Sequence, residues 1–481
     1  MKPRTPDTAP QDDLFRHRLD NIISLQHPLV RLAERIDWDG MNRLLGEYYE
    51  DAAVGQPPKP TRLMAGLLYL KHTFALSDEE LIARWVENAY WQYFCGETYF
   101  QHEPPIHPTS LTRYRQRLGP AGCEELLQLT IEAGVAEKVI EERDMAEVLI
   151  DTTVMEKAIT YPTDSKLYLK SLLRLNRQAK AHGIGLRQSY TRTGKRLAIK
   201  ASRYAHARQY RRMRKALKQL KGRLGRVVRD IERKTADWPS LPDTLAHELK
   251  LSKRLLAQQP KSRNKLYSLH APEAECISKG KAHKRYEFGV KVGVVASLRT
   301  PFILAAHALP GNPYDGHTLT WSLAQTKLNT GVAIKTAVVD KGYRGHKTGW
   351  PGVEVVIPGQ RSRDEAHRQQ RRKQLRRRSV IEALIGHMKT DGLLGRNWLK
   401  GSAGDAMHVV LCAAGQNLRL ILRAIAAFFA RYLPQLRRGA QGDARLQRPW
   451  RVLTRVWDTL VRRLTARLDP LGINSRRHLP A

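Results

Sequence analysis

The spacing of apolar side chains predicts a helical first third of the chain. Apolar residues recur every three or four positions in several stretches, which is typical of amphipathic helices. Ser77 with Glu80 forms a capping box, and Thr109 or Ser110 can cap the helix that follows the Pro-rich stretch 102–108. The predicted helices are 29–49, 61–74, 79–90 and 111–118.

The last of these helices is basic. Arg113, Tyr114, Arg115 and Arg117 are predicted to be exposed on it. The three short helices 61–74, 79–90 and 111–118, of which the last is basic, are typical of a helix-turn-helix DNA reader. A three-helix support domain whose arginines face water fits the same pattern equally well.

From residue 144 onward, short apolar runs predict strands. A first strand is expected to end at Asp151 and another to end at Asp340. The predicted strands are 146–151, 286–298, 302–309, 332–339 and 353–357, with helices over 317–328 and 379–389. A helical C-terminal region follows, with a basic tail from Arg437 and an amphipathic helix near 449–468.

Between the first two strands lies a strongly basic segment, 167–265. Within 208–234 apolar residues recur every three or four positions. This spacing predicts a pair or trio of amphipathic helices, with one face packed and the other able to lie along DNA phosphates.

Charge narrows the choice of partner. The 481 residues include 83 Lys and Arg against 46 Asp and Glu, a formal charge of +37. Such a surplus favours nucleic acid over the alternative, an acidic membrane surface. The N-terminus lacks an apolar signal core, and the longest apolar runs are interrupted by polar residues, so we expect no membrane span. Four widely spaced cysteines suggest reduced thiols and a cytoplasmic location.

Three acids form the candidate chemistry. Asp151 and Asp340 fall at the carboxyl ends of predicted strands, where open α/β sheets place their sites, and Mg²⁺ prefers such oxygen ligands. In the helix over 379–389, Arg378, Glu382 and Lys389 fall within a ~40° sector opposite the apolar face. A carboxylate between two cations suits a site that holds both a metal ion and phosphate.

These residues resemble the signature of the DDE transposases of bacterial insertion sequences. The branch marked by Tyr-x2-Arg-x3-Glu-x6-Lys is matched by Arg378, Glu382 and Lys389, whereas Leu375 occupies the tyrosine position. The stretches 150–167, 338–346 and 394–401 resemble the insertion-sequence-five-like group, and the likeness covers roughly residues 20–430.

The resemblance implies a multidomain α plus α/β protein. Its expected parts are a helical N-terminal DNA-binding region, a ribonuclease-H-like core, a basic helical insertion and a helical C-terminal region. Asp151 would lie on the first core strand, Asp340 after the fourth and Glu382 on a following helix. The expected bounds are 1–143, then 144–166 with 266–400 for the core, 167–265 for the insertion and 401–481 for the C-terminal region.

The implied activity is metal-dependent cleavage at the ends of a mobile element. Two Mg²⁺ ions, or Mn²⁺, held by Asp151, Asp340 and Glu382 would serve in-line phosphoryl transfer, after which the freed 3′-hydroxyl attacks target DNA. The expected partner is double-stranded DNA, bound by a homodimer or larger assembly because two ends must be joined. The alternatives are an endonuclease of the same fold without strand transfer and an inactive transposase that only binds DNA.

Other residues carry weaker hypotheses. Arg378 and Lys389 would hold phosphates, while Lys341 and Arg344 could touch DNA or fix their loop. The expected phosphate-binding set also includes Arg113, Arg115 and Arg117. Asp144, Asp315 and Asp391 are predicted to be a turn residue, a helix cap and a residue just past a helix end. Trp398 is predicted to lie in the core rather than to stack on a base.

Overall fold

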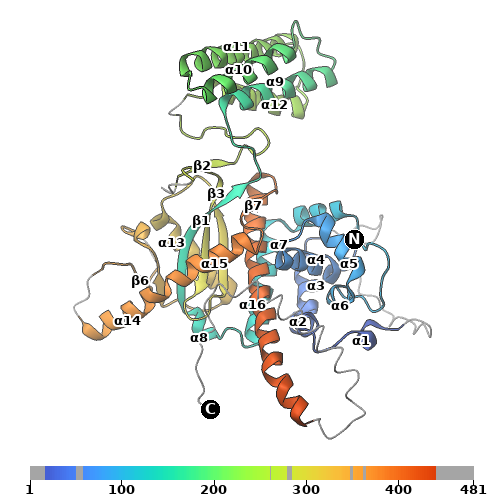
Figure 1. The fold of residues 1–481 in the computed structure, drawn as a ribbon, viewed down its shortest axis with the longest axis vertical. Coiled ribbons are helices and arrows are strands. Elements are labelled where there is room, and N and C mark those ends of the chain that lie inside the picture. Colours follow the sequence, from blue (N-terminus) through green and yellow to red (C-terminus); the bar gives the residue numbers. More distant parts are fainter. Residues whose placement is uncertain are drawn as a thin grey trace.

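The computed structural model describes residues 17–49, 58–259, 262–278, 284–346, 350–360 and 364–439. It is a mixed α/β protein in which helices surround one sheet, and helices α9 to α12 stand apart at one end (Figure 1). The predicted helix near 449–468 and the basic tail lie outside the described residues.

The sheet is built around β1 (Glu147–Lys157). On one side β1 pairs antiparallel with β3 (Glu287–Ser297), and β3 pairs antiparallel with β4 (Ile303–Leu309). On the other side β1 runs parallel to β5 (Thr336–Val338), which runs parallel to β6 (Glu354–Val356). Short strands β2 (Glu275–Ile277) and β7 (Arg396–Asn397) pair with β3 and β1.

The prediction that the first strand ends at Asp151 is wrong. Strand β1 continues to Lys157, so Asp151 lies near its middle. The β-branched residues Thr152, Thr153 and Val154 prolong the strand, because they suit a pleated surface. Strand β3 supplies a partner of equal length, with pairs from Val148↔Ser297 to Glu156↔Gly289.

The N-terminal helices pack against the sheet through α7 (Pro108–Ala136) and the C-terminal helix α16 (Gly401–Gly439). Helix α7 is kinked at Gly119, whose φ of +60° is left-handed, and Pro120 follows. The other helices are α1 (Leu19–Ile22), α2 (Pro28–Arg35), α3 (Trp38–Gly46), α4 (Thr61–Phe74), α5 (Asp78–Glu87), α6 (Ala89–Phe94) and α8 (Glu142–Met145).

One of the two predicted helix caps is confirmed and the other is wrong. Ser77 accepts a hydrogen bond from the Glu80 amide at 3.0 Å and so caps α5. Helix α7 begins earlier than predicted, at Pro108, and its cap is the His107 side chain rather than Thr109 or Ser110. Proline suits a first helical position because its missing N–H has no partner to lose there.

The basic segment forms four helices rather than the expected pair or trio: α9 (Asp164–Ala181), α10 (Thr191–His206), α11 (Tyr210–Lys234) and α12 (Asp243–Ala257). We call these four the helical module. Leu172, Leu220, Leu224 and Ile231 are fully buried within it and belong to a hydrophobic core separate from that of the rest of the chain. Strands β1 and β3–β6 and helices α2–α8 and α13–α16 share the other core. Together with α1, β2 and β7, we call these elements the main body.

The remaining helices follow β4. They are α13 (Asp315–Thr330), the 3₁₀ turn η1 (Lys341–Tyr343), α14 (Glu365–Arg377) and α15 (Ser379–Thr390). The segment Gly401–Ala430 of α16 is long and apolar enough to span a membrane by length and composition. It packs against α7, α4 and β4, which is the environment of a core helix.

Candidate active site at the strand ends

Asp151 and Asp340 occupy equivalent positions on two neighbouring parallel strands. The register pairs Leu149 of β1 with Val338, the last residue of β5. Asp151 lies two residues further along β1, and Asp340 lies two residues past the end of β5. The backbone at Asp340 is still extended, so both side chains leave the same face. Because neighbouring strands are about 4.8 Å apart, the two carboxylates lie side by side on one face of the sheet where β5 ends. We call this place the acidic edge.

Local hydrogen bonds orient both carboxylates. One Asp151 oxygen accepts the Thr152 amide at 2.7 Å, and one Asp340 oxygen accepts the Gly342 amide at 2.8 Å. Asp340 thereby caps the turn η1, which carries the chain away from the strand.

A third carboxylate, Asp315, lies beside Asp340. A Cβ added to Gly342 would stand 2.9 Å from Asp340 Oδ1 and 3.1 Å from Asp315 Oδ2, so both acids flank this glycine. The predicted capping role of Asp315 is wrong, because it is the first residue of α13 and Tyr314 occupies the cap position. Its Oδ1 instead accepts the Thr152 hydroxyl at 2.9 Å and the Lys291 ammonium at 2.7 Å.

The buried side chain of Tyr343 is influenced by all three acids. Its phenol is fully buried, and burial raises its pKa well above the ordinary value. The negative charges of Asp315, Asp151 and Asp340 raise the pKa further, in that order. All three carboxylates therefore act on the Tyr343 phenol, and the almost fully buried Lys291 is paired with one of them, Asp315.

Glu382 lies on α15, which packs against β1. Its side chain is 57% exposed, and its Oε1 accepts a 2.7 Å hydrogen bond from Arg378 Nη2, one helical turn earlier. The part of the chain that the structure describes contains no group of three or more His, Cys, Asp and Glu side chains arranged to hold a metal ion. The structure thus brings Asp151 and Asp340 together and leaves Glu382 paired with Arg378.

The predicted phosphate-binding cations differ in exposure. Lys341, Arg344, Arg113 and Arg117 are exposed, whereas Lys389 is half-buried. Arg117 lies over the Tyr49 ring, 4.5 Å from its centroid. Leu375, at the signature tyrosine position, is half-buried against the main core.

The expected exposure of Tyr114 and Arg115 is wrong. Both are buried, and the Arg115 side chain is only 4% exposed. Its guanidinium makes two hydrogen bonds to the Asp78 carboxylate, at 3.0 and 2.6 Å. A buried charge needs such a partner, so Arg115 joins α7 to α5 and is not available to phosphate.

Residues of two motif stretches meet in a buried polar cluster beyond the acids. Lys157, at the end of β1, contacts Asp405 at 2.5 Å and Glu273 at 2.8 Å. Asn397 of β7 donates to the same Asp405 oxygen at 2.7 Å. These contacts join β1 and β7 to the start of α16, which is a structural reason for polar residues at these positions.

Trp398, next to Asn397, is 61% exposed, so its predicted place in the core is wrong. The Arg396 guanidinium lies 5.4 Å from the centroid of its ring. Strand β7 alternates, and because the buried Asn397 points inward, the next side chain points outward.

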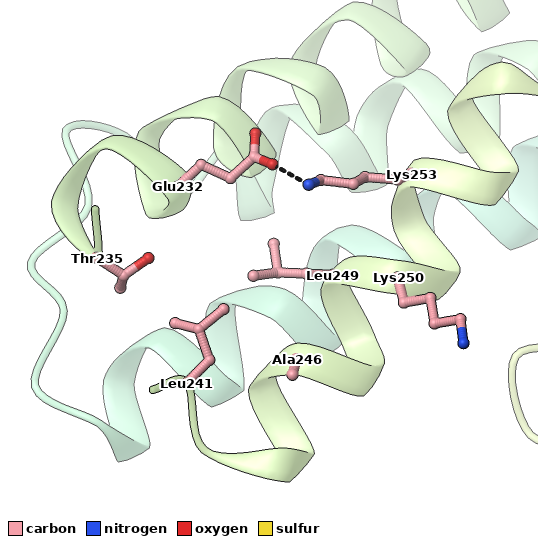
Figure 2. A pocket seen from close by; sticks show the side chains of 7 residues that line it. All are labelled: Glu232, Thr235, Leu241, Ala246, Leu249, Lys250 and Lys253. Atoms are coloured by element: carbon pink, nitrogen blue, oxygen red, sulfur yellow. Dashed lines mark ion pairs between the residues drawn. The ribbon is translucent and has the colours of Figure 1, made fainter. Parts of the chain in front are cut away.

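A surface pocket lies away from these acids, in the helical module. Figure 2 shows it between the end of α11 and α12, where Leu241, Ala246 and Leu249 form its floor. Its only carboxylate, Glu232, is paired with Lys253. The pocket therefore offers no unpaired acid for chemistry.

Comparison with known proteins supports the sequence resemblance. A family model described as a transposase domain matches residues 17–117, and a model described as a transposase DDE domain matches residues 257–418. An uncharacterized protein of Rhizobium meliloti, ORF8 in the nfe locus, is 52% identical over 210 residues, which are 44% of this chain and 100% of that protein. No solved structure matches the chain.

Proposed function

We propose that this chain, which contains a transposase DDE domain and a second transposase domain, cleaves DNA at the ends of a mobile element and joins the freed 3′-hydroxyl to target DNA. The observation that carries the proposal is the shared register of Asp151 and Asp340 on neighbouring parallel strands. Two carboxylates at such an edge are suited to phosphoryl transfer, which needs charge neutralisation and positioning rather than a covalent enzyme intermediate.

The donor set fits a hard divalent cation such as Mg²⁺. Asp151 and Asp340 offer only oxygen, and the spacing of neighbouring strands lets them share or bridge ions. The chemistry supplied by bound divalent ions is activation of water and stabilisation of the leaving oxygen of the phosphodiester. Lys291 is paired with Asp315, so its charge is held away from Asp151 and Asp340.

Glu382 joins Asp151 and Asp340 in the triad once it leaves its ion pair with Arg378. Its pair with Arg378 is exposed to solvent, and an exposed i,i+4 pair stabilises a helix by only about 0.3–0.5 kcal/mol. A DNA phosphate is a competing partner for Arg378, which frees Glu382 to turn toward the strand ends. Lys389, on the same helix, and the exposed Lys341 and Arg344 bind neighbouring phosphates.

The topology supports a ribonuclease-H-like core. Strands β1, β3 and β4 are antiparallel neighbours, and β5 and β6 then run parallel to β1. Asp151 lies on the first of these five strands and Asp340 after the fourth, as the resemblance implies. The domain bounds expected from the sequence place the interruption of this core between β1 and β3.

The N-terminal helices are proposed to bind DNA through α7. Arg113 and Arg117 are exposed on its first half, so they remain available to phosphate. Since two element ends must be cut together, a homodimer or larger assembly on double-stranded DNA in the cytoplasm is part of the proposal.

The test is cleavage of a labelled element-end duplex in Mg²⁺ and in EDTA. We expect nicking that leaves a 3′-hydroxyl in Mg²⁺, none in EDTA, and at least a hundredfold loss for Glu382→Ala with DNA binding retained. Glu365→Ala is the matched control, because Glu365 is also exposed and paired with an arginine on its own helix, yet lies outside the triad.

The outcomes separate the alternatives. Nicking without joined products on paired ends indicates an endonuclease, whereas DNA binding without nicking by the wild type overturns the enzymatic proposal. Equal losses for Glu382→Ala and Glu365→Ala would show that Glu382 has no special role.

A further inference from the structure

Helix α11 carries a row of six cations along one face, interrupted once by Gly222. It contains 11 Lys and Arg against 2 acids, and many of the cations are three or four residues apart. At 100° per residue, seven positions fall within an ~80° sector of the helix. They are Arg211, Lys215, Lys218, Gly222, Arg226, Arg229 and Arg233. We call these seven residues the cationic stripe.

The stripe faces away from the core of the module. The opposite side of α11 buries Leu220, Leu224 and Ile231 against the other three helices. All seven stripe positions are exposed, and a Cβ on Gly222 would meet open space. Figure 1 shows the module at one end of the molecule, with α11 on its outer side, so the rest of the chain does not cover the helix.

Few acids neutralise this row. Arg233 pairs with Asp230, and Arg226 approaches the Tyr190 hydroxyl at 3.5 Å. Among the described residues, Arg211, Lys215, Lys218 and Arg229 form no ion pair. Glu232 of the same helix lies on another side and reaches Lys253 of α12 (Figure 2). Unneutralised cations in one row repel each other, so an anionic partner would stabilise the folded module.

We propose that the cationic stripe binds the phosphate backbone of double-stranded DNA outside the bond that is cut. Arg211 and Arg233 are 22 residues apart, so the stripe is about 33 Å long. This matches one turn of B-form DNA, about 34–36 Å. The inference rests on the proposed function, because it takes a DNA end as the partner and assigns it a second contact away from the acids.

Two features favour duplex DNA over an anionic membrane. A helix that binds a membrane surface inserts an apolar face, and the apolar face of α11 is already buried in the module. Lys and Arg that recur along one face of the helix, with one gap at Gly222, suit a regular series of phosphates. Such contacts position a duplex without reading its bases.

The test compares two triple variants of the full chain. Lys215→Gln, Lys218→Gln and Arg226→Gln remove three charges from the stripe, and glutamine retains helix propensity. Lys180→Gln, Lys250→Gln and Lys253→Gln remove three exposed charges from α9 and α12 of the same module and form the control. Circular dichroism and melting temperature verify that both variants are folded.

Binding to a labelled 40-base-pair duplex is then measured over a series of salt concentrations. Each lost phosphate contact lowers the slope of log K against log salt by about 0.9, so we expect a slope smaller by about 2.7 and roughly tenfold weaker binding for the stripe variant. The control is expected to lose clearly less. Equal losses in the two variants, or a loss on phosphatidylserine vesicles but not on DNA, would overturn the proposal.

Cleavage of an element end is measured in the same preparations. A wild type that binds through the stripe but cannot nick DNA would refute the proposed function and leave the stripe assignment standing. A wild type that nicks DNA, with equal duplex binding by the stripe and control variants, would refute the stripe alone.

Discussion

The main body and the helical module use charged residues in opposite ways. In the body, cations such as Lys157 and Arg115 are buried and paired with Asp405 and Asp78. In the module the core is mostly aliphatic, and the cations of α11 are spread over an exposed face with few partners. Buried charge in the body therefore holds elements together, whereas the exposed charge of α11 is available to a ligand.

The two regions also have separate hydrophobic cores. Regions that do not share a core can unfold in separate transitions, because each loses its own buried contacts. If the comparison is correct, a substitution in one core will change the stability of one region and leave that of the other unchanged.

The largest expected effect comes from Lys157→Met in the body. Removing one partner of a buried ion pair costs about 3–5 kcal/mol, because Asp405 and Glu273 would remain buried without their cation. Burial already raises the pKa of Asp405, and Lys157 offsets part of that rise. Calorimetry is expected to show a lower melting temperature for the body transition alone.

A double variant provides the control. Adding Asp405→Asn to Lys157→Met removes one of the unpaired charges, so part of the lost stability is expected to return. A module transition that shifts as far as the body transition would contradict the separation of the two regions.

The reciprocal change is Leu220→Ala in the module. Leu220 is fully buried, and truncating such a leucine costs about 2–5 kcal/mol. We expect faster hydrogen exchange in α10 and α11 and a lower module transition, with the sheet amides unchanged. Leu304→Ala in β4 is the matched control, because Leu304 is equally buried in the main core. A single shared transition in both variants would show that the regions unfold as one.

The sequence patterns predicted the helices of the module only in part. The apolar period identified α11 and its packed face, but not the number of helices. The period shows that a stretch is helical, and it does not show where one helix ends and the next begins, as at 182–190, 207–209 and 235–242. In the body, β1 and β3–β6 were found by their apolar runs, whereas the short strands β2 and β7 were missed. The length of β1 was missed because its end depends on pairing with β3, which is distant in sequence.

The candidate site was predictable only in part for the same reason. Asp151 and Asp340 could be named from local patterns, and their shared register agrees with that choice. Asp315 was assigned to a helix cap because Lys291 and Thr152, which bind it, come from other strands. Arg115 was placed in water because its partner Asp78 lies on another helix.

Lowering the pH is expected to reduce the stability of the body through protonation of His408. Burial lowers its pKa from 6.5 to about 4, and the nearby cations Lys71, Lys157 and Arg115 contribute. The unfolded chain binds this proton below pH 6.5 and the folded chain only near pH 4, so stability is present above pH 6.5 and falls as the pH drops through that window. One such histidine accounts for about 2 kcal/mol between pH 7 and pH 5.

The measurement is urea unfolding at both pH values for the wild type and His408→Gln. We expect the variant to lose about 2 kcal/mol less than the wild type over this interval. His27 and His307, whose pKa values burial lowers to about 4 and about 3, keep part of the pH dependence in both proteins. An identical pH dependence in the two proteins would show that His408 is not the responsible group.

The smallest expected effect concerns Asp315→Asn, which tests whether the acids of the body act as one group. The change keeps the shape of the side chain but removes the charge that pairs with Lys291 at 2.7 Å. We expect roughly tenfold slower cleavage, about 1.4 kcal/mol, because Lys291 is then attracted to Asp151 and Asp340 and competes with the metal ion there. Raising the Mg²⁺ concentration is expected to restore much of the rate. A loss that Mg²⁺ does not restore would instead place Asp315 among the metal ligands, whereas an unchanged rate would confine it to holding α13 against β1. Either result decides whether two or three carboxylates of the acidic edge take part in cleavage in addition to Glu382.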